Sequence, residues 1–461
     1  MGILSVFLTG KHKTTATHQG EEMLAKSSNR DTMFQTGAFP AISAGRVGVR
    51  GLSKGAAAAL LASLLVATPV TATAKDLGSE DLGASIALEW QRIAQRTMFV
   101  DSQPATPVPA SPLYLGFSSL AMDAAVTSAR GQGTSASAAA AVAAHDVLVE
   151  YFPKSIDKLD ADLVTSLSKI PDGRAEGSGI EIGEAAAETM IASRQNDGRD
   201  AQPVYNKAQQ AGIWQPPATG MAVPWLGFVK PLVPRSTVTV DGPDPIGSAA
   251  YAADFNEVKR VGSATSSERT TAQTVTANFF SVNPVLQLRE ALLGHLDSHP
   301  LSLARTTRLF AALDAATADA LIQAWRLKFD IGYWRPFQSI PAADTDENDA
   351  TTADSSWKPL IDTPLPGTTT PRTTPPYPDY LSGHACVVGA FIETVKPVLG
   401  DLSLSVPALV TSTKRTYPNL SAIKDDAFMA RIWLGLHFRD AMDDGYKIGE
   451  GTGKQVSSQL S

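Results

Sequence analysis

Cysteine is almost absent from this chain, because Cys386 is the only one among 461 residues. An internal disulfide is therefore excluded, and cysteine usage gives no support for an oxidising compartment. Basic residues are not in excess either: the net charge is −7 at pH 7, and no long run of Lys and Arg occurs. This balance argues against nucleic acid or an anionic membrane surface as the main partner, and it favours a small-molecule ligand.

Long apolar runs are missing after the N-terminal region. No later stretch approaches the roughly 18 consecutive apolar residues that a membrane span requires, so we expect no transmembrane helix in the mature chain. With 461 residues, of which 43% are hydrophobic, the chain is long enough for one large or two ordinary globular domains.

The N-terminal region has the features of a secretory leader in the expected order. The basic residues Arg46, Arg50 and Lys54 lead into the apolar run GAAAALLASLLVATPV, and the small residues Thr-Ala-Thr-Ala follow. This order predicts cleavage after Ala74 and an exported protein, either periplasmic or secreted. The polar segment upstream is long for a leader, and Met33 is an alternative start. A buried Ala-rich helix is the competing interpretation.

Apolar residues recur at three- and four-residue spacing through most of the remaining chain, as in LGASIALEWQRIAQRTM and SAAAAVAAHDVLVEYF. This spacing predicts amphipathic helices and an all-α fold. Strand-like alternation is best at 236–240 (STVTV) and 273–280 (QTVTANFF), and either stretch could also be an extended loop. We expect a leader at 1–74 followed by a single large helical domain at 75–461.

Two segments interrupt the helical pattern. Residues 196–250 are dense in Pro, Gly and Trp and predict an irregular loop that covers a helical bundle. Residues 341–380 predict a structureless linker of about forty residues, and loops of that length are usually functional or disordered. Within the domain we expect a helical half at about 75–270 and a second half, containing the active site, at about 271–461.

The first chemical candidate is Ser382-Gly383-His384, between that linker and the helical pattern HACVVGAFIETVKPVLG. Ser382 has the chemistry of a helix N-cap, Gly383 permits close backbone approach, and Gly400 marks the expected helix end. A helix N-terminus presents unpaired N–H groups and the positive end of the dipole, so it can hold an anion beside His384. Taken alone, the pattern is also that of an ordinary capped helix with a surface histidine.

Lys328 and Arg335 form a second candidate upstream. Their seven-residue spacing places both on one face of a helix, only about 20° apart. Two cations suit a multiply charged anion, because Arg gives a planar fork and Lys a point charge. A solvated basic stripe is the alternative, although the neighbours Trp325, Tyr333 and Trp334 favour burial.

Arg431 and His437 form a third candidate downstream. They are six residues apart and would lie about 120° apart on a straight helix, so spacing alone does not predict that they meet one ligand. Their apolar neighbours favour burial, and a carboxylate beside a buried His would orient the imidazole as metal ligands and nucleophiles need.

Taken together, Lys-x6-Arg-Pro, Ser-Gly-His and Arg-x5-His resemble the active-site signature shared by vanadium-dependent haloperoxidases and the type-2 phosphatidic acid phosphatase superfamily. The match covers about residues 320–450, and flanking patterns look closest to the soluble bacterial haloperoxidases. The resemblance implies an all-α helical bundle of the vanadium haloperoxidase type, with long irregular loops and little or no sheet. It also implies a core site for vanadate, or for phosphate in the same place.

The resemblance assigns anion binding to five residues. Lys328, Arg335 and Arg431 would neutralise the oxygens of the anion, while Ser382 and the N–H of Gly383 would donate to it. Fixed cations in a dry site can hold a trianion that otherwise stays hydrated, and they stabilise charge that develops during the reaction.

The resemblance also assigns roles to both histidines. His437 would bind vanadium directly or attack phosphorus as a nucleophile, and His384 would be the acid–base residue. Trp325 and Tyr377 fall where the haloperoxidases place aromatic residues of the halide pocket, although hydrophobic packing explains these two residues as well.

These assignments imply a haloperoxidase that oxidises halide with hydrogen peroxide to hypohalous acid, with a small organic acceptor as further partner and with vanadium pentavalent throughout. The alternative is an exported acid phosphatase that acts on phosphate esters through a phosphohistidine at His437. The shared signature does not separate them, although Trp325 and Tyr377 favour the peroxidase. An inactive phosphate-binding helical protein is a third interpretation. The halide, the organic substrate and the oligomeric state stay open.

Three positions depart from the pattern of the relatives. Leu381 and Ala430 stand where many relatives have Pro and Ser, and Ala441 stands where an Asp often follows the final His by four residues. Asp440 is one position early, and on a helix it would share a face with His437. Asp440 is therefore the sequence-based candidate for orienting that histidine.

The remaining histidines are weaker candidates. His295 and His299 have the spacing of a metal-binding helix face, but Pro300 ends the segment and no Glu follows the first His as in zinc proteases. We expect a pair at a helix C-terminus without a ligand. His145 is expected to be a packed helix residue.

Overall fold

The computed structural model describes residues 79–461 except for 132, 235–236, 370–371 and 411–412. The leader predicted for residues 1–74 and its cleavage after Ala74 lie outside this range, so both stay predictions. The division of the helical domain into two halves also stays a prediction.

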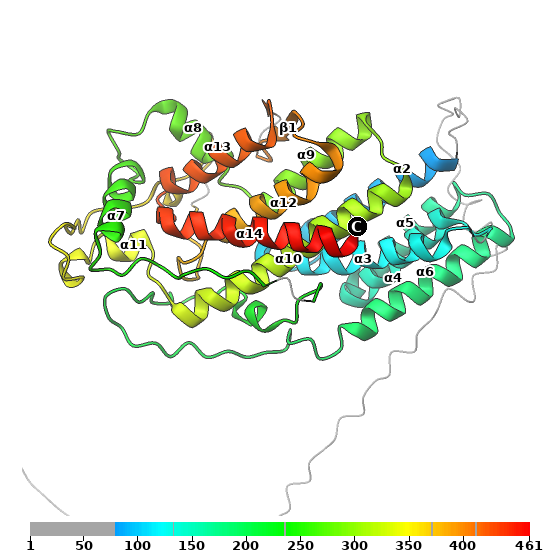
Figure 1. The fold of residues 1–461 in the computed structure, drawn as a ribbon, viewed down its shortest axis with the longest axis horizontal. Coiled ribbons are helices and arrows are strands. Elements are labelled where there is room, and N and C mark those ends of the chain that lie inside the picture. The colour runs from blue at the N-terminus through cyan, green and yellow to red at the C-terminus, as the bar shows by residue number, and fades with distance from the viewer. Residues whose placement is uncertain (1–78, 132, 235–236, 370–371, 411–412) are drawn as a thin grey trace, which may run out of the picture. The chain divides into compact units, whose positions relative to one another are not determined.

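The described chain is mainly helical (Figure 1). Its α-helices are α2 (Ser79–Arg96), α3 (Ser111–Ala129), α4 (Ala136–Tyr151), α5 (Ile156–Leu167), α6 (Arg174–Ser193), α7 (Ala249–Val261), α8 (Thr271–Phe279), α9 (Pro284–Ser298), α10 (Leu303–Ile331), α11 (Pro336–Ser339), α12 (Gly383–Leu399), α13 (Leu420–Trp433) and α14 (Arg439–Leu460). Short helical turns are η2 (Thr97–Asp101), η3 (Val108–Ala110), η4 (Pro153–Ser155), η5 (Pro224–Phe228), η6 (Ala343–Thr345) and η7 (Leu360–Asp362). The prediction of an all-α helical fold with little sheet is confirmed. None of the described helices is both long and apolar enough to cross a membrane.

Helix α10 connects the N-terminal helices to the C-terminal ones. It packs against α3 and α2, and also against α12 and α14 (Figure 1). Ser302 begins it by accepting a hydrogen bond from the N–H of Arg305, and Gly332, with φ of 69°, ends it. The last turn of α10, which carries Lys328, is thereby fixed against the C-terminal helices.

Glycines bring α14 unusually close to α12. A Cβ at Gly445 would lie 2.6 Å from the carbonyl oxygen of Ser382, and a Cβ at Gly449 would lie 2.9 Å from the Cα of Cys386. Only glycine permits this approach of two backbones. The N-terminus of α12 is therefore held directly against α14.

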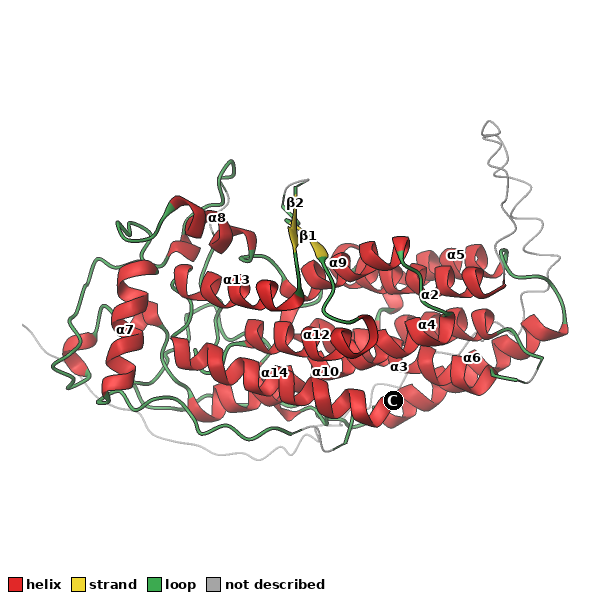
Figure 2. Cartoon of the chain, turned by 45° about the horizontal axis from the view of Figure 1, so that its top comes forward, coloured by secondary structure: helices red, strands yellow, loops and turns green. Residues whose placement is uncertain are grey.

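Neither of the two strand-like stretches forms a strand where it is described, and residues 237–240 are irregular. Residues 273–280 lie mostly in α8, because Thr270 and Gln273 form a capping box that starts a helix and overrides the local β-propensity. The sheet is a hairpin that the sequence pattern did not reveal: β1 (Leu404–Pro407) pairs antiparallel with β2 (Lys414–Tyr417), as Figure 2 shows.

Both predicted irregular segments are confirmed in their described parts. Residues 196–250 are mostly irregular, and their short helical turn η5 packs against α10. Residues 341–380 contain only the short turns η6 and η7 where they are described, and they end with buried residues directly before α12.

Candidate active site

The predicted site residues come from helix ends. Lys328 is in the last turn of α10, Arg335 directly precedes α11, and Ser382 caps α12. Arg431 is in the last turn of α13, and His437 lies between α13 and α14. All five side chains are buried.

Lys328 and Arg335 do not share one helix face, contrary to the expectation from their spacing. Helix α10 ends at Ile331, Gly332 turns the chain, and Arg335 has extended backbone before α11. The glycine turn still leaves the two cations within electrostatic range, because Arg335 lowers the pKa of the buried Lys328.

A second glycine turn separates Arg431 from His437. Helix α13 ends at Trp433, and Gly435 has φ of 72°. A Cβ at Gly435 would lie 2.7 Å from the carbonyl oxygen of Gly262, so the turn requires glycine. Because the chain leaves the helix here, the 120° separation expected on a straight helix does not apply.

The sequence-predicted residues therefore gather in one buried region, which we call the cage. The cage consists of Lys328, Arg335, Ser382, Gly383, His384, Arg431 and His437.

Positive charge is concentrated in the cage. Burial lowers the pKa of Lys328 well below its usual range, and Arg335 and Arg431 lower it further, against the effect of Asp379. Burial also lowers the pKa of Arg431 to about 10. Buried like charges destabilise one another, so an anion bound among them would be strongly favoured.

Backbone carbonyls hold the two cations of the α10–α11 region. The Nζ of Lys328 donates to the carbonyl oxygens of Pro378 and Asp379 at 2.8 and 2.9 Å. The Nε of Arg335 donates to the carbonyl oxygen of Tyr377 at 2.7 Å. These carbonyls are neutral, and the nearby acidic group is Asp379, whose Oδ1 lies 3.9 Å from the Nη1 of Arg335.

Four buried nitrogens of the cage lack a hydrogen-bond partner among the described residues. One is His437 Nδ1, which lies 2.7 Å from Oδ1 of Asp379, and the other three are Arg335 Nη2, Arg431 Nε and His384 Nε2. Buried polar groups are normally satisfied, and each unsatisfied one costs about 1–3 kcal/mol. The last three nitrogens come from three separate segments of the chain. A tetrahedral or trigonal oxyanion carries enough acceptor oxygens to satisfy them, so the residues present fit vanadate or phosphate.

The start of α12 forms one wall of the cage. The Oγ of Ser382 accepts a hydrogen bond from the N–H of Ala385 at 3.3 Å, which confirms the predicted N-cap. A Cβ at Gly383 would lie 2.8 Å from Cζ3 of Trp325, so the absence of a side chain lets the indole pack against the helix N-terminus.

The two aromatic residues predicted for a halide pocket lie together beside Lys328. The ring centroids of Trp325 and Tyr377 are 4.9 Å apart, and the Nζ of Lys328 is 5.6 and 5.0 Å from them. Trp325 is buried and Tyr377 is half-buried. The pair thus covers the cation with polarisable rings, a geometry that favours cation–π attraction.

Burial favours the neutral form of both cage histidines. Burial lowers the pKa of His437 well below its usual range, and the charges of Arg335 and Lys328 lower it further. Burial and Arg431 lower the pKa of His384 in the same direction. Each imidazole therefore keeps a lone pair that can bind a metal, attack an electrophile or accept a proton.

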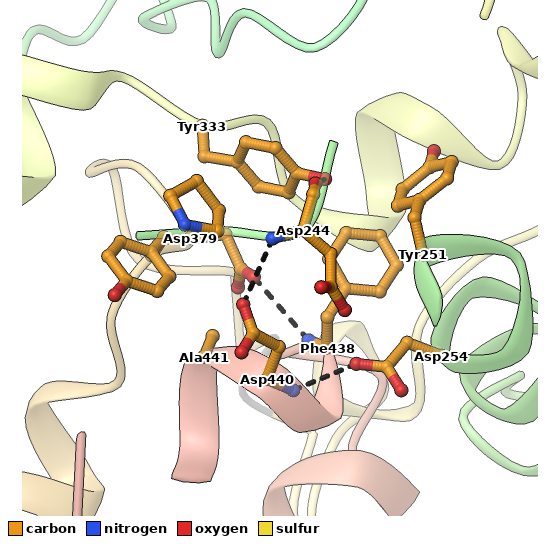
Figure 3. Close-up of a pocket in the computed structure, with 10 residues that line it drawn as sticks. Asp244, Tyr251, Asp254, Tyr333, Asp379, Phe438, Asp440 and Ala441 are labelled. Carbon is orange, nitrogen blue, oxygen red and sulfur yellow. Dashed lines mark hydrogen bonds between the residues drawn. The ribbon is translucent and has the colours of Figure 1, made fainter. Parts of the chain in front are cut away.

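Asp379, which sequence reasoning missed, lies against His437. Its Oδ1 is 2.7 Å from the Nδ1 of His437, although the two atoms are not aligned as a hydrogen bond. Asp440 does not make this contact; its Oδ2 accepts from the N–H of Asp244 at 3.2 Å (Figure 3). The expectation for Asp440 fails because α14 begins only at Arg439, so helical spacing from His437 does not apply. The available sequence signal was the position of Asp379 three residues before the Ser-Gly-His motif.

Asp379 also lines a small cavity beside the cage, which we call the acidic cavity (Figure 3). Asp244, Asp254 and Asp440 line it as well, and the N–H of Asp440 donates to Oδ2 of Asp254 at 2.8 Å. Burial raises the pKa of Asp254 to about 6 and that of Asp440 to about 7. Part of this cavity is therefore protonated at mildly acidic pH.

Replacing Asp440 with Asn should raise the melting temperature more at pH 8 than at pH 5. The folded-state pKa of Asp440, about 7, lies above its unfolded value. The folded state therefore binds more protons in this window, and the stability that Asp440 contributes at low pH is lost as the pH rises through about 7. Asn stays neutral, so it removes this loss.

Thermal unfolding of both proteins at the two pH values tests this prediction. Asp354 provides a matched control, because hydrogen bonds from Ser356 hold the pKa of Asp354 below its usual value, outside the window. Asp354→Asn should therefore shift the melting temperature equally at pH 5 and pH 8. An equal shift for Asp440→Asn would contradict the burial argument.

The other histidines that the structure describes, His145, His295 and His299, are not among the residues of the cage. The rings of His295 and His299 are stacked with centroids 4.4 Å apart. Among the residues that the structure describes, no group of three or more His, Cys, Asp or Glu side chains could hold a metal ion. His145 is packed in α4, as predicted, and contacts Asp146 and Asp160 through Nδ1 and Nε2 at 2.7 and 2.9 Å.

Known proteins match both the sequence and the fold. Residues 308–461 match a family model described as the VCPO second helical-bundle domain. Vanadium chloroperoxidase of Curvularia inaequalis is 35% identical over 89 residues, which are 19% of this chain and 14% of that protein. The aligned segment therefore spans much less than two thirds of the curated relative.

Solved structures match over most of the chain. A bacterial vanadium-dependent iodoperoxidase superposes with a TM-score of 0.63 at 19% identity, over 84% of this chain and 98% of its own. The apo form of a bacterial vanadium-dependent chloroperoxidase gives 0.56 at 16% identity, over 86% and 96%. The holo form gives 0.51 at 16% identity, over 85% and 94%. At these identities the likeness shows the fold alone.

The fold is the helical fold of vanadium chloroperoxidase type. In sequence, the C-terminal residues 308–461 match the second helical-bundle domain of this type, and over most of its length the chain is similar to vanadium haloperoxidases in fold.

Proposed function

We propose that this chain is a vanadate-dependent haloperoxidase that oxidises a halide with hydrogen peroxide to hypohalous acid. The observation that carries the proposal is the cage itself, in which three cations are buried and nitrogens of Arg335, Arg431 and His384 lack a hydrogen-bond partner among the described residues. Its relatives are described as vanadium-dependent peroxidases, and this supports vanadate as the ligand.

Lys328, Arg335 and Arg431 would hold the negative oxygens of vanadate in this site. Because the side chains are buried, their attraction for an anion is much less screened than in water. Arg335 and Arg431 each have an unsatisfied nitrogen to donate, and the hydroxyl of Ser382 at the N-terminus of α12 can donate as well. Bound vanadate would supply a Lewis-acidic centre at which hydrogen peroxide is activated towards halide.

The histidines would divide two tasks. His437, with Nδ1 against Asp379, can present Nε2 to vanadium. His384 is neutral with Nε2 unpartnered, so it can accept a proton from the incoming peroxide and return one to the product. Trp325 and Tyr377 would form the halide side of the cage beside Lys328.

Parallel assays test the proposal. Protein incubated with orthovanadate is supplied with hydrogen peroxide and with chloride, bromide or iodide, and halogenation of a small organic acceptor is measured. The same preparation without vanadate is tested for hydrolysis of phosphate esters. We expect halide oxidation that depends on added vanadate. Folded protein without activity in either assay would rule out both enzymatic functions.

An acid phosphatase is the second candidate, and the contact between Asp379 and His437 supports it as well. A carboxylate next to one imidazole nitrogen is the arrangement that a nucleophilic histidine needs at the other nitrogen. Phosphate would occupy the same cage, and His437 would become a phosphohistidine. Hydrolysis without vanadate, with no halide oxidation, would select this function.

A protein that binds phosphate without turnover is the third outcome of the same assays. Export of the protein stays part of the proposal, since the leader features that predict it lie at residues 1–74.

A further inference from the structure

We infer that Asp379 is the positioning residue of His437, the task that helical spacing had assigned to Asp440. This inference rests on the proposed function, because it assigns to Asp379 the task of keeping the reactive nitrogen of His437 available.

Asp379 is fixed on several sides. Its side chain is fully buried. Its N–H donates to the carbonyl oxygen of Tyr333 at 2.9 Å, its own carbonyl accepts from Lys328 at 2.9 Å, and its Oδ2 accepts from the N–H of Phe438 at 3.4 Å. These contacts leave Oδ1 directed at His437, 2.7 Å from Nδ1.

Oδ1 of Asp379 and Nδ1 of His437 are each other's available partner. Both atoms are buried, and neither makes an aligned hydrogen bond to another described residue, although the Nη1 of Arg335 also lies 3.9 Å from Oδ1. A small rotation of the imidazole would align the pair. A carboxylate at Nδ1 keeps the ring proton on that nitrogen, so Nε2 keeps its lone pair.

We expect a carboxylate at position 441 to be able to replace the one at position 379, because both residues line the acidic cavity. Figure 3 shows Asp379 and Ala441 on its wall, with the loop before α12 supplying one and the first turn of α14 the other. The carbonyl of Ala441 also accepts from the N–H of Ser382 at 2.8 Å, which ties the two segments together. Two carboxylates at these positions would repel each other, whereas one suffices for His437.

Asp440 cannot take this task while its present contacts hold. Its carboxylate accepts from Asp244, and its own N–H donates to Asp254. Asp440 is therefore a matched control for Asp379, because both line the acidic cavity but only Asp379 contacts His437.

Replacing Asp379 with Ala should weaken orthovanadate binding about 10–100-fold, the usual effect of losing the partner of a ligating histidine. The double variant Asp379→Ala/Ala441→Asp should recover most of the affinity, because it returns a carboxylate to the same cavity. Asp440→Asn should leave the affinity unchanged. Calorimetric titration with orthovanadate measures all three, and Asp379→Asn, which keeps the side-chain volume, substitutes for the Ala variant if that variant does not fold.

The tautomer of His437 gives a readout without vanadate or turnover. In protein labelled with nitrogen-15 at histidine, with the resonances assigned through His437→Gln, the wild type should show a protonated Nδ1 and an unprotonated Nε2. Asp379→Ala should lose this preference, and the double variant should regain it. A merely structural role for Asp379 would leave the tautomer unchanged.

The outcomes separate the inference from the proposed function. If the wild type catalyses neither reaction but the tautomer follows the carboxylate, the proposed function fails and the positioning role stands. If the wild type oxidises halide while Asp379→Ala keeps both the affinity and the tautomer, the positioning role of Asp379 is overturned alone. If Asp379→Ala folds but the added Ala441→Asp does not restore orthovanadate affinity, then a carboxylate at position 441 cannot replace the one at position 379.

Discussion

Replacing His437 with Ala should reduce turnover about 10³-fold or more in whichever assay detects activity, since it removes a group bonded to the reacting centre. In both candidate functions the same imidazole is used, as a vanadium ligand or as a nucleophile. The neighbouring side chains cannot supply a substitute, because Lys328 and Arg335 are cations and Asp379 is held by the N–H of Phe438.

Histidine replacement elsewhere in the chain provides the control. His295 lies in the last turn of α9, stacked on His299, and makes no contact with the cage. His295→Ala should therefore keep full activity. Both variants should give the same circular dichroism spectrum as the wild type. Retention of activity by folded His437→Ala would refute the assignment of the cage as the active site.

Replacing Arg431 with Met should affect ligand binding and stability in opposite directions. Loss of one charged donor should weaken vanadate or phosphate binding about 10²-fold. Without the anion, the variant should be as stable as the wild type or more stable, by up to about 1–4 kcal/mol, because an apolar side chain replaces a buried charge.

The surroundings of Arg431 explain the second effect. Its guanidinium is buried with Nε unsatisfied, and Nη1 donates a long hydrogen bond of 3.3 Å to the carbonyl oxygen of Phe280. Burial lowers its pKa to about 10, which shows that the folded protein disfavours the charged form. Arg335 lies within electrostatic range and adds repulsion. The charge that Arg431 provides for anion binding therefore lowers the stability of the anion-free protein.

Urea unfolding with and without phosphate, together with titration of orthovanadate, measures both effects. The matched control is Arg439→Met, since Arg439 makes a two-pronged ion pair with Glu257 at 2.9 and 2.6 Å. Removing this paired Arg should lower stability slightly and leave anion binding unchanged. A large loss of stability in anion-free Arg431→Met would contradict the interpretation that the cage is strained by uncompensated charge.

Several features of the fold and the site follow from local sequence. Ser382 and Gly400 mark the two ends of α12, because capping chemistry acts within one helical turn. The three-residue and four-residue spacing of apolar side chains predicts the helical class, since it depends only on the period of the helix. The three-part motif around Lys328, Ser382 and Arg431 also predicts the residues of the cage, although it says nothing of the contacts between them.

Other features did not follow from the spacing of apolar residues or from β-propensity. Thr270 and Gln273 cap α8 over a stretch with β-propensity, and the hairpin of β1 and β2 forms where no strand pattern is evident. The free energy of the hydrogen bonds in a cap or a hairpin is as small as the helix and strand propensities that oppose it. The sequence pattern alone therefore does not decide between helix and strand.

The site shows the same limit most clearly. Helical spacing placed Lys328 and Arg335 on one face and assigned the orientation of His437 to Asp440, but both inferences assumed helices that continue. Positive-φ glycines end α10 and α13 before those positions, so the cage is assembled by chain turns rather than by helix faces. Sequence by itself determined which residues form the cage and that the fold is helical. Only packing between segments distant in sequence decided that Asp379 faces His437, because a contact across the fold has no local period.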